Sequence, residues 1–224
     1  MKNGLALWLF DIDGTLVDTG GAGMQALREA SEACFGDPGP ALDLAGSTDL
    51  GIVHGLFAHF GAEPEEDRIE LFFSAYLARL EWNLGRPPFC GRVLPGVVAL
   101  LDKLEQTPGV TIGLLTGNIA AGATAKMRHF GLDRYFPFGA YGCDHADRNL
   151  LGAVALRRAS EHARRTFEPA ETLVIGDTPK DISCARAIGA KSLAVATGRF
   201  GTHELESCGA DITVETLEHF LAIW

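Results

Sequence analysis

Short apolar runs and amphipathic segments alternate along most of the chain. The first run, residues 5–10, contains no polar residue, which is typical of a strand buried on both faces of a parallel sheet. Later apolar runs fall at residues 110–115, 136–141, 172–175, 192–196 and 212–214. Helical patterns separate or follow them, at residues 97–105, 120–130, 149–165, the stretch that ends near 188, and the C-terminus. This alternation predicts an α/β fold with a doubly wound, mostly parallel sheet.

Residues 18–91 depart from this alternation. Three helical patterns follow one another there, at about 22–35, 47–61 and 65–83, and no strand pattern interrupts them. Turns rich in glycine and proline bound the block, at residues 18–21 and 85–88. We therefore predict a catalytic core formed by residues 1–17 and 92–224, with residues 18–91 inserted as an all-helical cap domain.

Three of the predicted strands run directly into polar clusters. In a parallel sheet the carboxyl ends of the strands meet at one edge, where α/β proteins bind ligands. Four carboxylates gathered there cannot all stay ionised unless a cation joins them, and Mg²⁺ suits such oxygen ligands. The hydroxyl and amide donors of the same clusters suit a tetrahedral oxyanion. The clusters are Asp11-Ile12-Asp13-Gly14-Thr15, Thr116-Gly117-Asn118 and Gly176-Asp177-Thr178-Pro179-Lys180-Asp181.

Each cluster also has a simpler interpretation. Asp-x-Asp-Gly occurs in calcium-binding loops, but the twelfth position of such a loop is glutamate and here it is Ala22. The Thr116–Asn118 tripeptide alone is compatible with a plain turn. Asp177 and Asp181 alone are compatible with an acidic helix N-terminus. The three clusters in this order, each after an apolar strand, are far more specific than any one of them.

Composition narrows the classes of partner. The chain has 224 residues, 47% of them hydrophobic, and a formal net charge of -10, which disfavours nucleic acid and anionic membranes as partners. Five cysteines are widely spaced, so we expect reduced thiols rather than a disulfide framework. The leading apolar run is interpreted as the first strand and not as a signal peptide, and no run is long enough to cross a membrane. We expect a soluble, cytoplasmic protein.

The three clusters resemble motifs I, II and IV of the haloacid dehalogenase superfamily, most of whose members are Mg²⁺-dependent phosphatases. The insert after the first motif resembles the helical C1 cap, and the chain is most similar to the phosphoglycolate-phosphatase-like branch. The resemblance implies a Rossmann-like core and hydrolysis of a small phosphorylated metabolite through an aspartyl-phosphate intermediate. The oligomeric state, monomer or homodimer, is left open.

The resemblance also implies a role for each acidic residue. Asp11 would be the nucleophile, and Asp13 would protonate the leaving alcohol and then activate water. The carboxylates of Asp11 and Asp177 and the backbone carbonyl of Asp13 would hold Mg²⁺, with Asp181 in support. An aspartate two residues after the nucleophile favours phosphoryl transfer over dehalogenation.

The phosphoryl oxygens would be bound by motif II and by the end of motif I. The resemblance implies that the Thr116 hydroxyl donates to them, assisted by the backbone amides of Gly117 and Asn118. Thr15 adds a further hydroxyl donor at the same strand end.

Motif III of the superfamily is usually a lysine between motifs II and IV. Lys126 is the one lysine in that interval, and we expect it to lie some three turns into a helix that leads away from the site. Arg148 stands just before the next helix and is therefore predicted to supply the catalytic cation. An exposed arginine without function is the alternative. Lys180, inside motif IV, is expected to point to solvent.

Two other functions remain open. A phosphosugar mutase similar to β-phosphoglucomutase would use the same Asp-x-Asp pair, although residues 18–91 carry no further acid–base pattern. A binding protein that kept the fold without turnover is disfavoured because every expected aspartate is present. The polar stretch 46–49 either faces the substrate with its amides or simply caps the following helix.

Overall fold

The protein, seen in a computed structural model, is described for residues 4–41 and 45–224. Its main sheet has six parallel strands in the order β5-β4-β1-β6-β7-β8. This confirms the predicted doubly wound α/β fold, with β1 at the point where the strand order reverses. The strands are β1 (Leu7–Phe10), β4 (Thr111–Leu115), β5 (Gly139–Ala140), β6 (Thr172–Gly176), β7 (Lys191–Val195) and β8 (Ile212–Val214).

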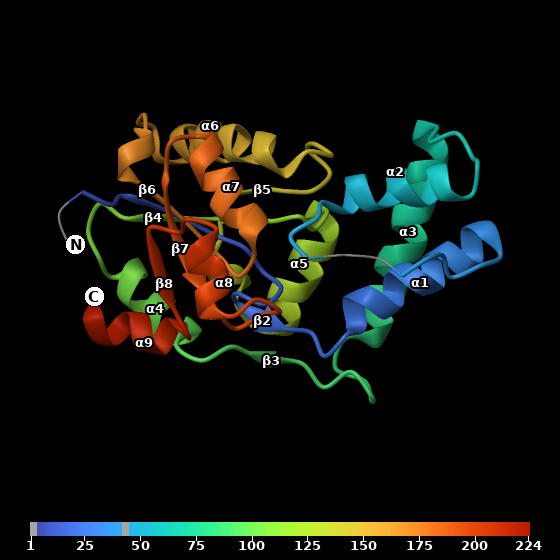
Figure 1. The fold of residues 1–224 in the computed structure, drawn as a ribbon, viewed down its shortest axis with the longest axis horizontal. Helices are drawn as coiled ribbons and strands as arrows, with labels where there is room; N and C mark the ends of the chain where they lie inside the picture. The colour runs from blue at the N-terminus through green and yellow to red at the C-terminus, as the bar shows by residue number, and fades with distance from the viewer. Residues whose placement is uncertain (1–3, 42–44) are drawn as a thin grey trace.

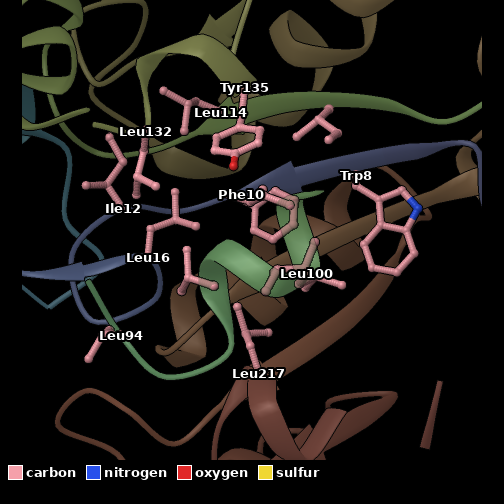
Figure 2. Packing of buried hydrophobic residues seen from close by; sticks show 14 of the residues in the cluster. Trp8, Phe10, Ile12, Leu16, Leu94, Leu100, Leu114, Leu132, Tyr135 and Leu217 are labelled. Carbon is pink, nitrogen blue, oxygen red and sulfur yellow. The ribbon is translucent and has the colours of Figure 1, made fainter. Parts of the chain in front are cut away.

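Helices cover both faces of this sheet because alternate residues of β1 are buried on opposite sides. Trp8 and Phe10 pack with α4 (Val97–Glu105), α5 (Ala120–His129) and α9 (Leu217–Ile223), as Figure 2 shows for Leu100 and Leu217. Leu7 and Leu9 pack on the other face with α6 (Leu151–Ala163) and α7 (Pro179–Ala187) (Figure 1). The remaining helical segments are α8 (Thr202–Ser207), η1 (Asp133–Tyr135), η2 (Arg148–Leu150) and η3 (Pro169–Glu171).

Three helices stand together at one end of the molecule (Figure 1), α1 (Ala22–Phe35), α2 (Asp49–His59) and α3 (Glu66–Asn83). They have a hydrophobic core of their own, in which Phe57, Phe72 and Leu80 are fully buried or nearly so. Ile119, at the start of α5, also belongs to this cluster. The helical insert therefore packs against the strand ends of the main sheet. The assignment of residues 18–91 to a separate domain stays a prediction.

A two-stranded antiparallel ribbon joins the insert to the sheet domain, and the sequence analysis did not predict it. In it β2 (Val17–Asp18) pairs with β3 (Arg92–Val93). Strands of two residues are too short to give a hydrophobic period. The ribbon lies where the chain enters and leaves the helical insert, so the two crossings run side by side.

No helix in the described ranges 4–41 and 45–224 combines the length and the apolar character needed to span a membrane.

Candidate active site

The site lies at the carboxyl ends of β4, β1 and β6, which are neighbours in the sheet. Asp11 follows β1, Thr116 follows β4 and Asp177 follows β6. Because the three strands are parallel and in register, residues more than 100 positions apart in sequence meet at one edge. The predicted gathering of the three polar clusters is thus observed.

Three of the predicted metal ligands form a buried acidic group. Asp11, Asp177 and Asp181 each offer a carboxylate oxygen, and these oxygens lie within 4.8 Å of one another. Glycines make room for them, since a Cβ on Gly14 would lie 2.4 Å and one on Gly198 1.8 Å from Asp177 Oδ2. The Asp13 carboxylate is not part of this group and turns elsewhere.

The electrostatics of this group favour a cation. Burial, together with the charges of Asp181 and Asp11, raises the pKa of Asp177 to about 8. Burial raises the pKa of Asp11 to about 6, although the charge of Arg148 opposes the rise. An all-oxygen, carboxylate-rich donor set is what hard divalent cations such as Mg²⁺ prefer. The residues present therefore fit a divalent metal ion.

Arg148 is buried beside this group, as the sequence analysis predicted. Its Nη2 lies 3.2 Å from Asp11 Oδ1, and it forms a very short ion pair with Asp181. Burial would lower the pKa of Arg148, but the charges of Asp181 and Asp11 raise it above its ordinary value. A planar guanidinium that spans two carboxylates is well suited to hold both. The alternative of an exposed arginine is thereby excluded by geometry.

Asp181 serves the fold as well as the site. Its Oδ2 accepts hydrogen bonds from the Thr178 backbone amide at 3.0 Å and from the Thr178 hydroxyl at 2.7 Å. These contacts form the capping box of α7. The simpler interpretation of motif IV, acidic capping, therefore holds together with the functional one.

Lys126 corrects the sequence analysis. We expected its helix to carry it away from the site, but it is 3% exposed and its Nζ lies 2.8 and 2.6 Å from the two carboxylate oxygens of Asp13. Helix side chains lean toward the helix N-terminus, and α5 begins at the site. A long side chain in its second turn therefore reaches back to the strand ends. The direction of the helix axis was the wrong criterion.

The predicted phosphate-binding residues are all at the strand ends, but several already have partners. The Thr15 hydroxyl lies 3.2 Å from Asp177 Oδ1, to which it donates. The Asn118 backbone amide donates to Thr116 Oγ1 at 3.3 Å, and the Asn118 side-chain amide donates to Asp13 Oδ2 at 2.8 Å. Phosphate binding by Thr15, Thr116, Gly117 and Asn118 stays a prediction, with these hydrogen bonds as its starting state.

A cavity of about 500 Å³ opens over these residues. Asp11 and Asp13 lie at its sheet side, and the helical insert contributes mostly apolar side chains. This size suits a small organic molecule. The apolar lining from the insert consists of Met24, Leu27, Ile52 and Tyr76.

The stretch before α2 docks directly on the sheet domain. The Asp49 backbone amide donates to Gly117 O at 2.7 Å, and its carboxylate accepts from the Ile119 amide at 2.8 Å. Thr48 caps α2 by accepting from the Gly51 amide. Because these amides are engaged by protein groups, the capping interpretation of residues 46–49 is favoured over an anion site. Lys180 is exposed as expected, yet its Nζ donates to Ser47 Oγ at 2.6 Å.

Comparisons with known proteins agree with this geometry. Residues 6–189 match the family model of haloacid dehalogenase-like hydrolases. The chain is 31% identical over 219 residues to a Probable phosphatase IndB from Dickeya dadantii, covering 94% of this chain and 89% of that protein. It is 27% identical over 200 residues to a phosphoglycolate phosphatase from Agrobacterium fabrum, covering 86% and 81%. A crystal structure of a predicted phosphoglycolate phosphatase from Haemophilus somnus covers the whole chain and 99% of its own with a TM-score of 0.72, at 19% identity.

Proposed function

The chain belongs to the haloacid dehalogenase-like hydrolase family as a phosphoric monoester hydrolase, and we propose that it hydrolyses a small phosphomonoester, phosphoglycolate or a similar compound, with Mg²⁺ as cofactor. Asp11 is the nucleophile in this proposal and Asp13 the general acid and base. The proposal extends to phosphate binding by Thr116, Thr15 and the amides of Gly117 and Asn118.

One observation carries the proposal. Two carboxylates two residues apart line the same cavity in different environments, Asp11 with its side chain 7% exposed and Asp13 with 42%. A buried carboxylate fixed by an arginine suits a nucleophile, because it attacks from one defined position. A carboxylate open to the cavity suits a group that exchanges protons with a leaving alcohol and with water.

The residues perform the reaction in two steps. In the first, a carboxylate oxygen of Asp11 bonds to phosphorus while the bond from phosphorus to the ester oxygen breaks, and that oxygen takes the Asp13 proton. In the second, Asp13 removes a proton from water, the water oxygen bonds to phosphorus, and the bond to Asp11 breaks. Phosphate leaves and both carboxyl groups return to their starting states.

Within this proposal Asp11 and Asp177 hold the metal ion, with Asp181 and the backbone carbonyl of Asp13 in support. When bound, a divalent cation supplies positive charge to the acidic group and to the oxygens of the transferring phosphoryl group. Asp181 is the weakest ligand of the set, because both of its oxygens already face Arg148 or Thr178.

The test is phosphate release from a panel of small phosphomonoesters, including p-nitrophenyl phosphate and phosphoglycolate, by purified protein with Mg²⁺. We expect release that stops with excess EDTA, returns with Mg²⁺ and is absent in Asp11→Asn. Transfer of phosphate between two positions of a sugar phosphate without net release would support the mutase instead. A folded wild-type protein that acts on no ester of the panel would contradict the proposal.

A further inference from the structure

Lys126 is placed so that its side chain runs back along α5 toward the site. It lies in the second turn of the helix, on the buried side with Ala123 and Met127. Across from it on α1, Gly23 leaves room for the ammonium, since a Cβ there would lie 3.5 Å from Lys126 Nζ. The sequence thus provides a narrow channel of small residues for one long cationic side chain.

The ammonium is surrounded by oxygen atoms of two residues. Besides the two carboxylate oxygens of Asp13, the Asn118 Oδ1 atom lies 2.6 Å from Lys126 Nζ. The Asn118 amide also donates to Asp13 Oδ2 at 2.8 Å, which closes a triangle of three side chains. An ammonium has three donors, so this set can use all of them. Asp13 is therefore held from one side by two residues while its other side faces the cavity.

Stability alone gives no reason for a charge at this position. Burying an ammonium costs free energy even when it is paired, and an apolar side chain of similar length would avoid that cost. The buried acidic group already has its own cation in Arg148. What Lys126 adds is the fixed position of one carboxylate, that of Asp13.

We propose that Lys126 is a positioning residue that holds the Asp13 carboxyl group toward the leaving-group oxygen. This inference rests on the proposed function, in which the Asp13 proton moves to that oxygen as its bond to phosphorus breaks. Lys126 itself gains and loses no proton. Its positive charge stabilises the carboxylate that remains on Asp13 after the proton has moved.

The proposal has a consequence that a purely structural lysine would not have. An alkyl phosphate needs a proton on its leaving oxygen, whereas 2,4-dinitrophenol leaves as a stable anion. We expect Lys126→Met to lower kcat/KM for an alkyl phosphate about 100-fold, a typical contribution of general acid catalysis. The loss for 2,4-dinitrophenyl phosphate should be no more than about threefold, since proton transfer contributes little there.

The experiment measures kcat/KM of wild type, Lys126→Met and Lys126→Gln with a series of phosphate esters of graded leaving-group acidity. This parameter reports the steps up to the first irreversible cleavage, so the later attack of water does not enter. Lys103→Met is the matched control, because Lys103 is exposed on α4 outside the cavity, and it should leave every value unchanged. Lys126→Gln keeps a donor and a similar volume, and it carries the comparison if Lys126→Met does not fold.

Two results would overturn the proposal. One is an equal loss for all esters in a folded Lys126 variant. The other is a large further loss when Lys126→Met is added to Asp13→Asn and assayed with 2,4-dinitrophenyl phosphate, because Lys126 would then act without Asp13. A wild-type protein that is inactive toward every ester counts against the proposed function and is thereby distinguished from a failure of this inference.

Discussion

Two carboxylate–cation pairs lie next to each other after β1, and they differ in burial. Arg148 and Asp11 have side chains 5% and 7% exposed, and Asp181 joins them as a second carboxylate. Lys126 and Asp13 are 3% and 42% exposed. In one pair both partners are closed off from water, and in the other only the cation is. The first arrangement fixes an attacking group and its metal ligands, and the second leaves a carboxyl group free to meet the substrate.

The largest expected difference is in catalysis. Asp11→Asn should lower kcat/KM by at least about 10⁴-fold for every ester, as expected when a nucleophile is removed. Asp13→Asn should lower it about 10²- to 10⁴-fold for alkyl phosphates, the range of general acid–base catalysis, and far less for 2,4-dinitrophenyl phosphate. Steady-state kinetics with both ester types measures the contrast. Equal losses in Asp13→Asn for the two types would remove the distinction between the carboxylates.

The second difference is in stability. Arg148→Met leaves buried carboxylates without their cation and should lower the free energy of unfolding by about 3–5 kcal/mol in metal-free protein. Lys126→Met leaves a carboxylate that water can still solvate, so we expect a loss of only about 1 kcal/mol. Urea denaturation monitored by circular dichroism measures both. Arg157→Met, which removes an exposed charge on α6, is the control and should stay within about 0.5 kcal/mol of wild type. Similar losses for the Arg148 and Lys126 variants would contradict the assigned difference in burial.

The third prediction concerns pH and metal. The folded-state pKa values of Asp177, about 8, and Asp11, about 6, lie above that of an unfolded aspartate. A raised pKa means that the folded state binds more protons, so this contribution to stability is present at low pH and is lost as pH rises through these values. Metal-free protein should therefore lose roughly 2 kcal/mol, or about 5 °C in Tm, between pH 5.5 and 8.5.

Mg²⁺ should restore most of that loss at pH 8.5, because it binds the ionised carboxylates. Asp177→Asn is the control and should show a weaker dependence on pH and on Mg²⁺. Thermal unfolding in EDTA and in Mg²⁺ across this range provides the measurement. A metal-free protein that becomes more stable as pH rises would show that the acidic group is not crowded as described.

The smallest effect concerns the stretch before α2, which touches the more buried pair through the hydrogen bond from Arg148 Nη1 to Gly46 O at 3.2 Å. Thr48 caps α2 and its hydroxyl donates to Ala146 O at 2.6 Å. Thr48→Ala should cost about 1 kcal/mol of stability without changing the ratio of kcat/KM values between esters. A higher KM for one ester alone, with unchanged stability, would instead support the substrate-facing interpretation of residues 46–49.

The fold and the acidic group could be predicted because both are local in sequence. Apolar runs that end in aspartates fix the strands and the edge at which Asp11 and Asp177 meet. Arg148 was also predictable, since its place just before a helix near the sheet edge was enough. These inferences needed strand order and strand ends but no side-chain directions.

The remaining features depend on three-dimensional contacts. Lys126 was misjudged because the direction in which a helix side chain leans decides where its head group lies. The β2–β3 ribbon is too short to leave a pattern, and its partners are far apart in sequence. The docking of Asp49 on Gly117 and Ile119 likewise joins distant segments, and no periodicity reports it.

The most direct test of the central claim, phosphoryl transfer to Asp11, is to trap the intermediate. Protein turning over p-nitrophenyl phosphate with Mg²⁺ is quenched with borohydride, which reduces an acyl phosphate to an alcohol, and its peptides are mapped by mass spectrometry. The account predicts a reduced side chain at position 11, absent without substrate and absent in Asp11→Asn. Reduction at position 13, or none in a protein that releases phosphate, would contradict it.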